Sequence, residues 1–150
     1  MEPLVTLIAV TGVLLLARAR PAAALRGGLA AMYTLTGAAH FVGMRDEIVA
    51  MVPPALPAPE LLVTLTGIAE LACALGLLWP RTTRVAAAVL SVLLIAMFPA
   101  NVHAAAGDVA WWDRLGPRTA LQCVFLAATV TVLLRGARAP LRRRRTPAQH

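Results

Sequence analysis

Charged residues are scarce in this chain. Only 14% of its 150 residues are Asp, Glu, Lys or Arg, while 59% are hydrophobic. A typical soluble domain is about 25% charged and about 45–50% apolar. A globule of this size has too small a core to remove so much apolar surface from water. The composition therefore excludes an ordinary soluble domain and predicts a multi-pass protein of the cell membrane, with the lipid bilayer as its first partner.

Cysteine and lysine are also nearly missing. The chain has two cysteines, and all fourteen of its basic residues are arginine. Cys73 and Cys123 form no C-x-x-C motif, so neither a thiol relay nor a metal site is expected. The net charge is +7, but no basic stripe is interleaved with aromatic residues, so nucleic acid is not the expected partner. We expect the arginines to set the membrane topology and to meet anionic lipid headgroups.

Long apolar stretches predict an all-α transmembrane helical bundle. A spanning helix needs about 20 apolar residues, with a range of about 17–25. The third and fourth stretches meet this length, the second and fifth are borderline, and the first is short. The stretches are 4–17, 27–43, 61–79, 85–105 and 119–134.

The charge between the stretches alternates along the chain. The connections 18–26 and 80–84 and the tail after 134 carry arginine and no acid, whereas the loops 44–60 and 106–118 are nearly neutral. The positive-inside rule then predicts about five spans, with the N-terminus outside and the C-terminus in the cytoplasm. No positive charge precedes the first apolar stretch, so we expect that stretch to be a retained helix and not a cleaved signal peptide.

Glu70 is the main candidate for function. It lies in the middle of the third stretch, where a charged side chain costs about 2.5–3.5 kcal/mol on insertion scales. Small or polar residues, among them Thr66, Gly67 and Cys73, lie three or four positions before or after it. These residues share one helix face, and small residues let another helix approach closely. We therefore expect this face to point into the bundle.

Other polar residues reach the outer ends of neighbouring spans. Together they predict a polar intramembrane pocket that opens outward, with Glu70 as its floor and the proline-rich loop 52–59 as its roof. Asn101 and His103 are about 200° apart on an ideal helix, so both face the interior only if Pro99 distorts or ends the helix. The alternative for each residue is a plain hydrogen bond to a neighbouring helix. The predicted pocket residues are Glu70, His40, Asn101, His103, Gln122, Tyr33 and Thr66.

Several pieces in order resemble the DoxX-like family of membrane proteins. They are Gly37–Phe41, Val52-Pro53, Leu65–Pro80, Phe98–Ala104 and the pair Arg118 and Gln122. The resemblance covers roughly residues 27–134.

The resemblance implies a compact bundle of four membrane helices. This chain adds an apolar segment before it. The expected organisation is an additional N-terminal transmembrane helix at 1–20, a DoxX-like four-helix domain at 21–135 and a basic cytoplasmic tail at 136–150. Some members of the wider family resemble subunits of thiosulfate:quinone oxidoreductase, and others have antioxidant or receptor-assembly roles.

Three functions stay open at this point. The first is a non-catalytic membrane partner or assembly subunit, which the small-residue helix faces favour. The second is a quinone-binding subunit of an oxidoreductase, in which Glu70 and His40 take up protons while Asn101 and Gln122 bind carbonyl groups. The third is a small-solute or lipid transporter, since a carboxyl at the membrane midplane suits proton coupling. The sequence leaves the partner, the oligomeric state and any enzymatic activity open.

Overall fold

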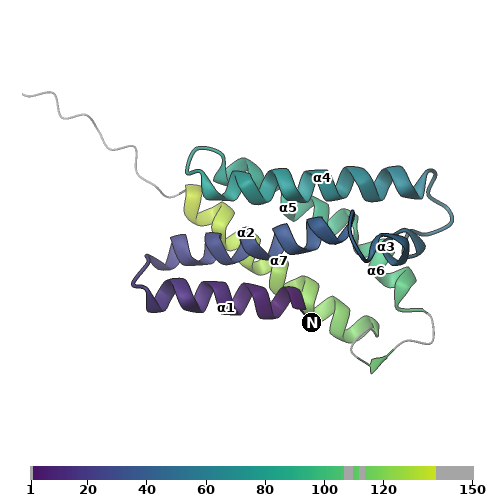
Figure 1. Cartoon of the computed structure of the whole chain (residues 1–150), viewed down its shortest axis with the longest axis horizontal. Helices are drawn as coiled ribbons and strands as arrows, with labels where there is room; N and C mark the ends of the chain where they lie inside the picture. Colours follow the sequence, from purple (N-terminus) through teal and green to yellow (C-terminus); the bar gives the residue numbers. More distant parts are fainter. Residues whose placement is uncertain (1, 107–109, 112–113, 138–150) are drawn as a thin grey trace, which may run out of the picture.

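A computed structural model describes residues 2–106, 110–111 and 114–137, and the regular elements in these residues are α-helices (Figure 1). Three helices are long and apolar enough to cross a membrane, namely Pro59–Leu78, Thr83–Ala104 and Leu115–Arg135. The predicted all-helical class with membrane-length helices is confirmed. The elements are α1 (Glu2–Leu16), α2 (Pro21–Ala39), α3 (Arg45–Ala50), α4 (Pro59–Leu78), α5 (Thr83–Ala96), α6 (Phe98–Ala104) and α7 (Leu115–Ala137).

The long helices run antiparallel to their neighbours along the chain (Figure 1). The α1–α2 turn (17–20), the α4–α5 turn (79–82) and the last turn of α7 lie at one end of the bundle, which we call the arginine end. The α2–α4 connection (40–58) and α6 lie at the opposite end, which we call the loop end.

The α1–α2 turn is closed by the backbone of its own residues. Arg18 has a left-handed backbone with φ of 61°. Its amide donates to the carbonyl of Leu15, and the amide of Ala19 donates to that of Leu14, both at 2.9 Å. This pair of bonds is a Schellman motif, which satisfies the last carbonyls of a helix. The turn thus places α1 directly against α2.

Three boundaries differ from the sequence prediction. Helix α2 begins at Pro21, before the apolar stretch, because proline at the first helical position loses no needed hydrogen bond. The fourth apolar stretch is broken at Met97, since Pro99 has no N–H to donate to the carbonyl four residues earlier. Helix α3 lies inside the loop predicted at 44–60, with Asp46 and Glu47 in its first turn, where acids favour the helix dipole.

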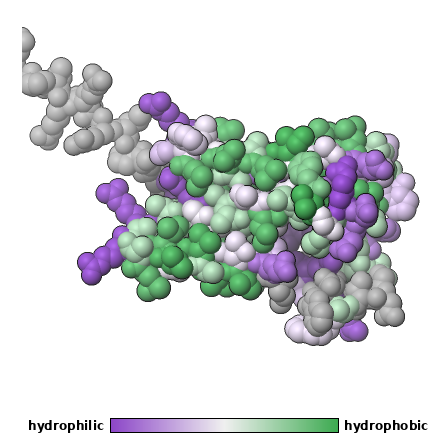
Figure 2. All heavy atoms as spheres, viewed as in Figure 1, coloured by the Kyte–Doolittle hydropathy of each residue, from purple (hydrophilic) through white to green (hydrophobic). Residues whose placement is uncertain are grey.

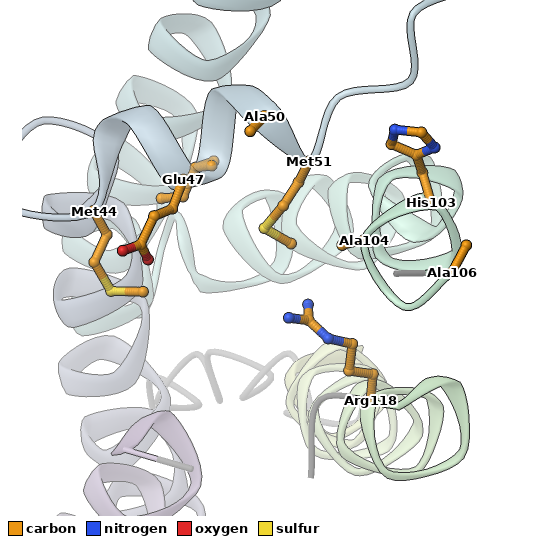
Figure 3. Close-up of a pocket in the computed structure, with 9 residues that line it drawn as sticks. Met44, Glu47, Ala50, Met51, His103, Ala104, Ala106 and Arg118 are labelled. Carbon is orange, nitrogen blue, oxygen red and sulfur yellow. The ribbon is translucent and has the colours of Figure 1, made fainter. Parts of the chain in front are cut away.

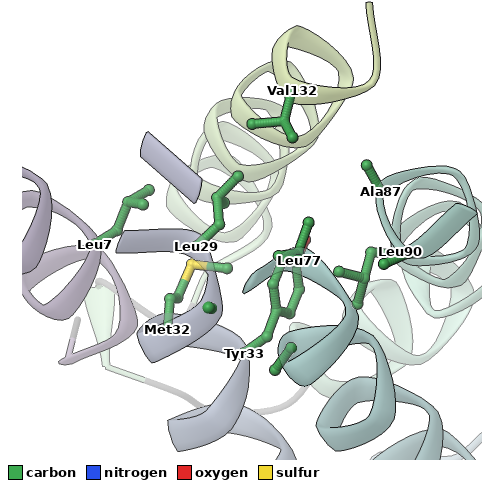
Figure 4. Close-up of a cluster of buried hydrophobic side chains, with 11 residues drawn as sticks. Leu7, Leu29, Met32, Tyr33, Leu77, Ala87, Leu90 and Val132 are labelled. Atoms are coloured by element: carbon green, nitrogen blue, oxygen red, sulfur yellow. The ribbon is translucent and has the colours of Figure 1, made fainter. Parts of the chain in front are cut away.

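Five helices contribute side chains to one buried cluster (Figure 4). Tyr33, Leu29, Leu77 and Leu90 are almost fully buried there, and Leu7 of α1 and Val132 of α7 join them. The outward faces stay apolar, and Figure 2 shows hydrophobic surface along the bundle with hydrophilic surface mainly toward its ends. Only 28%, 22% and 11% of the residues in the three membrane-length windows are buried, so the bundle itself leaves most residues of these apolar helices uncovered.

Candidate functional site

Helices α2 and α4 cross where a glycine of each helix lies against a polar residue of the other. A Cβ on Gly67 would lie 2.6 Å from Cβ of His40, and a Cβ on Gly37 would lie 3.1 Å from Cβ of Glu70. Each glycine is three residues before the polar residue of its own helix, so the two share a helix face. The missing side chains let the two backbones approach closely. We call Gly37, His40, Gly67 and Glu70 the α2–α4 crossing.

His40 and Glu70 form a buried pair at this crossing. Nδ1 of His40 lies 4.0 Å from Oε2 of Glu70, and the side chains are only 4% and 7% exposed. The same Nδ1 lies 2.9 Å from the carbonyl oxygen of Thr36. A carbonyl oxygen can only accept, so Nδ1 carries the hydrogen and Nε2 is the free nitrogen of the neutral ring.

Two atoms of this pair have no hydrogen-bond partner among the described residues. They are Nε2 of His40 and Oε2 of Glu70, and both are buried. Buried polar atoms are nearly always paired, so two unpaired atoms on neighbouring side chains make this pair the candidate site of the bundle. At 4.0 Å the two groups are too far apart for a direct hydrogen bond, so a proton could pass between them only through a bridging water or ligand atom.

Tyr33 joins α2 to α7 one helical turn before the α2–α4 crossing. Its hydroxyl lies 2.9 Å from Oγ1 of Thr129, and the Thr129 hydroxyl donates to the carbonyl of Phe125 at 2.8 Å. Since Thr129 has one hydrogen to give, Tyr33 is the donor in the first bond. Tyr33 and Thr129 are almost fully buried, so this chain of bonds fixes the position of α2 along α7.

Asn101 and Gln122 form a second polar group between α6 and α7. The amide of Asn101 donates to Oε1 of Gln122 at 2.8 Å, and the amide of Gln122 donates to the carbonyl of Leu94 at 2.6 Å. The guanidinium of Arg118 lies 3.5 Å from the side-chain oxygen Oδ1 of Asn101. The group therefore ties the broken end of α5 and α6 to α7. His103 is exposed and stays outside it.

A small cavity of about 200 Å³ lies beneath the proline-rich loop. Val52, Pro53 and Leu56 cover it, and Thr66 and Asn101 are the polar side chains in its otherwise apolar wall. Thr66 donates its hydroxyl hydrogen to the carbonyl of Leu62. An apolar ligand in this cavity would therefore leave no hydroxyl donor of the wall unpaired. Glu70, His40 and Gln122 are not among the lining residues.

A larger, open cavity of about 630 Å³ lies at the loop end between α3, α6 and α7 (Figure 3). The guanidinium of Arg118 and the thioether of Met51 point toward each other across it, whereas His103 points away from Arg118. Glu47 and Met44 complete the wall on the α3 side.

The structure distributes the predicted pocket residues over several places. His40 and Glu70 meet at the α2–α4 crossing, and Asn101 and Gln122 meet between α6 and α7. Thr66 and Asn101 share the smaller cavity, Tyr33 lies in the core, and His103 lines the larger cavity. The polar residues thus share the loop-end half of the bundle without facing one common space.

Arg45 is a site residue that sequence reasoning missed. Its guanidinium donates to the carbonyl of His40 at 3.0 Å and to the hydroxyl of Thr64 at 3.0 Å. It also lies 3.4 Å from the carbonyl of Glu60. Arg45 therefore joins the end of α2 to the first turns of α4, directly beyond the His40–Glu70 pair. Its place beside two acids in a neutral loop concealed this role.

Comparison with known protein families finds a match. The model of a domain of unknown function, DUF8561, matches residues 29–132. The chain belongs to the DUF8561 family. The DUF8561 region begins inside α2 and ends inside α7, so it contains the α2–α4 crossing and the Asn101–Gln122 contact, and α1 lies before it. No curated protein and no solved structure matches the chain.

Two predictions from the sequence concern metal binding and the C-terminal tail. Among the described residues, no group of three His, Cys, Asp or Glu side chains could hold a metal ion. The predicted basic tail, 136–150, lies outside the described residues from 138 onward.

Proposed function

We propose that this DUF8561 protein is an integral, multi-pass membrane protein of the DoxX-like type that acts as a non-catalytic partner or assembly subunit. Its large apolar side chains on the outer faces support the membrane setting. On α4 and α5 these include Leu65, Ile68, Leu75, Val92 and Ile95, all more than half exposed. In water such a surface would aggregate, whereas lipid tails accept it.

The proposed topology has five spans, an outer N-terminus and a cytoplasmic C-terminus. The distribution of charge over the folded bundle supports this orientation. The arginine end carries Arg18, Arg20, Arg81, Arg84 and Arg135, and the acids Asp46, Glu47 and Glu60 lie at the loop end. The positive-inside rule assigns the arginine end to the cytoplasm. Helix α1, with 15 residues, crosses with help from snorkelling arginines at its end.

The outward face of α7 is the proposed binding surface for a partner subunit. Helix α7 packs mainly against α5, with smaller contacts to α2 and α6, and only 11% of its membrane-length window is buried. Its outward face presents Ala120, Cys123, Ala127 and Thr131 at spacings of three and four. Small side chains at this spacing let a second membrane helix pack closely, which lipid tails do not require.

The test is purification in mild detergent with mass spectrometry of any protein that remains bound. We expect a partner at one copy per chain, lost when Ala127→Leu fills the face of α7. The matched control is Ala72→Leu, since Ala72 is exposed on the outer face of α4, and this variant should keep the partner. A wild-type protein recovered alone, or only with further copies of itself, contradicts the proposal.

Quinone binding is the second candidate, and the His40–Glu70 pair favours it. The unpaired Nε2 and Oε2 atoms offer a proton acceptor and a hydrogen-bonding group where water is scarce. The apolar cavity beneath the proline-rich loop could take a ring or an isoprenoid tail, and Thr66 in its wall is one helical turn from Glu70. A quinone would supply two-electron redox chemistry there, with electrons from a partner subunit.

Organic extraction of the purified protein followed by mass spectrometry tests this second candidate. Quinone near one per chain in the wild type, reduced in Glu70→Gln and His40→Ala, would support it. Glu60→Gln is the matched control, because Glu60 is a carboxyl in the first turn of the same helix. Equal amounts of quinone, or none, in all four samples would contradict it.

A further inference from the structure

The arginine end gathers positive charge without a described acid to balance it. Arg18 and Arg20 lie in or beside the α1–α2 turn, Arg81 and Arg84 lie at the α4–α5 turn, and Arg135 lies in the last turn of α7. The described acids lie elsewhere, in the first turns of α1, α3 and α4 and at the α2–α4 crossing. The arginine end could therefore bind an anion that balances its positive charge.

Arg26 differs from the exposed arginines of this end because it is half-buried. It is five residues after the start of α2, about 7.5 Å along the helix axis. Its Nε atom is buried and has no hydrogen-bond partner among the described residues. The residues three, four and seven positions later, Leu29, Ala30 and Tyr33, are all buried, so Arg26 lies on the face of α2 that packs inward.

The contacts of this face indicate which part of α7 lies at the level of Arg26. Tyr33 bonds to Thr129, and Leu29 and Val132 lie in one buried cluster (Figure 4). The two helices run antiparallel, so one further turn toward the arginine end brings Arg26 to the level of Arg135. Arg26 of α2 and the exposed Arg135 of α7 thus both lie toward the arginine end of the bundle.

We propose that this position binds the headgroup phosphate of an anionic phospholipid, held by Arg26 and Arg135. A guanidinium presents paired N–H donors that match two phosphate oxygens. A partly buried positive group needs a counter-charge, since desolvation without one is costly. In the proposed orientation, on which this inference rests, the arginine end lies at the cytoplasmic surface, where lipid headgroup phosphates are found. Leu134 beside Arg135 is 56% exposed and offers apolar surface to the lipid chains.

The experiment is native mass spectrometry of the full chain from mixed phosphatidylglycerol and phosphatidylcholine nanodiscs. We expect one phosphatidylglycerol to stay bound in preference to phosphatidylcholine, with retention falling about tenfold in Arg26→Gln, the loss of one bidentate charged contact. Arg135→Gln should show a smaller loss. Arg84→Gln removes the same charge from the same end of the bundle and should retain the lipid.

Three results would overturn the assignment. Equal losses in Arg26→Gln and Arg84→Gln would mean that only the general surface potential attracts the lipid. Equal retention of both lipids by the wild type would remove the anion specificity. Inorganic phosphate that binds in lipid-free detergent with the same dependence on Arg26 would make free phosphate the ligand. Should Arg26→Gln fail to fold, Arg26→Lys keeps the charge without the paired donors, and unchanged retention in that variant would also contradict the proposal.

Discussion

His40 and Glu70 each lie against a glycine of the opposite helix, and their side chains meet with Nδ1 and Oε2 4.0 Å apart. The reciprocal arrangement sets both the spacing of α2 and α4 and the contact between the two polar groups. A change in either glycine should therefore move the pair as well as the helices. Arg45 fixes the same two helices just beyond the pair.

Gly67→Ala should destabilise the bundle by about 1–3 kcal/mol, as expected for overpacking a close contact. The added Cβ would lie 2.6 Å from Cβ of His40 and 2.8 Å from the ring of Phe41. The measurement is thermal unfolding in detergent. Gly12→Ala is the control, because nothing lies within 4 Å of its Cβ position in α1. That variant should be unchanged or gain up to about 1 kcal/mol of helix propensity; equal effects at both positions would count against a close crossing.

Tyr33→Phe should cost about 1 kcal/mol, the usual contribution of a buried hydrogen bond. The lost contact is the bond to Thr129 between α2 and α7. A double-mutant cycle with Thr129→Val isolates the pair, and we expect a coupling energy of similar size. Thr131→Val serves as the control, since Thr131 bonds only to the carbonyl of Ala127 in its own helix. A coupling energy of zero with Thr129 would disprove the proposed tie.

Arg45→Gln should loosen the α2–α4 connection without unfolding the bundle. The variant loses the donors that reach the carbonyl of His40 and the hydroxyl of Thr64. Hydrogen exchange read by mass spectrometry should rise across 41–58 and stay unchanged in α5. Arg45→Lys retains the charge but not the forked geometry, so an intermediate rise is expected. Exchange that rises equally in α5 would instead indicate a general loss of stability.

Single cysteines should report the membrane orientation. In a background of Cys73→Ala and Cys123→Ala, Arg81→Cys at the arginine end should react with an impermeant maleimide only from the cytoplasmic side. Ala50→Cys at the loop end should react only from outside. Labelling of both positions from one side would contradict the antiparallel crossing of α4, and exchanged sides would reverse the proposed orientation.

Much of the helical structure follows from the order of apolar and polar residues. The apolar stretches predicted the long helices, and the spacing around Glu70 predicted its inward face, which is confirmed by the burial of Val63, Gly67, Glu70, Ala74 and Leu77. The exact ends were harder to predict. The first turn of α2 includes no large apolar residues before Leu25, and α3 is a six-residue helix in a polar loop, so neither produces a strong periodic signal.

The sequence by itself determined which segments are long and apolar enough to cross a membrane and which faces the helices bury, because both depend on the composition and spacing of residues along one chain segment. Only the tertiary structure decided which polar residues meet. Tyr33 and Thr129 are 96 positions apart, and Gln122 reaches Asn101 and Leu94 on another helix. Periodicity tells which side of a helix faces inward but not which helix lies there. That choice depends on crossing angles and on where glycines let backbones approach, as at the α2–α4 crossing.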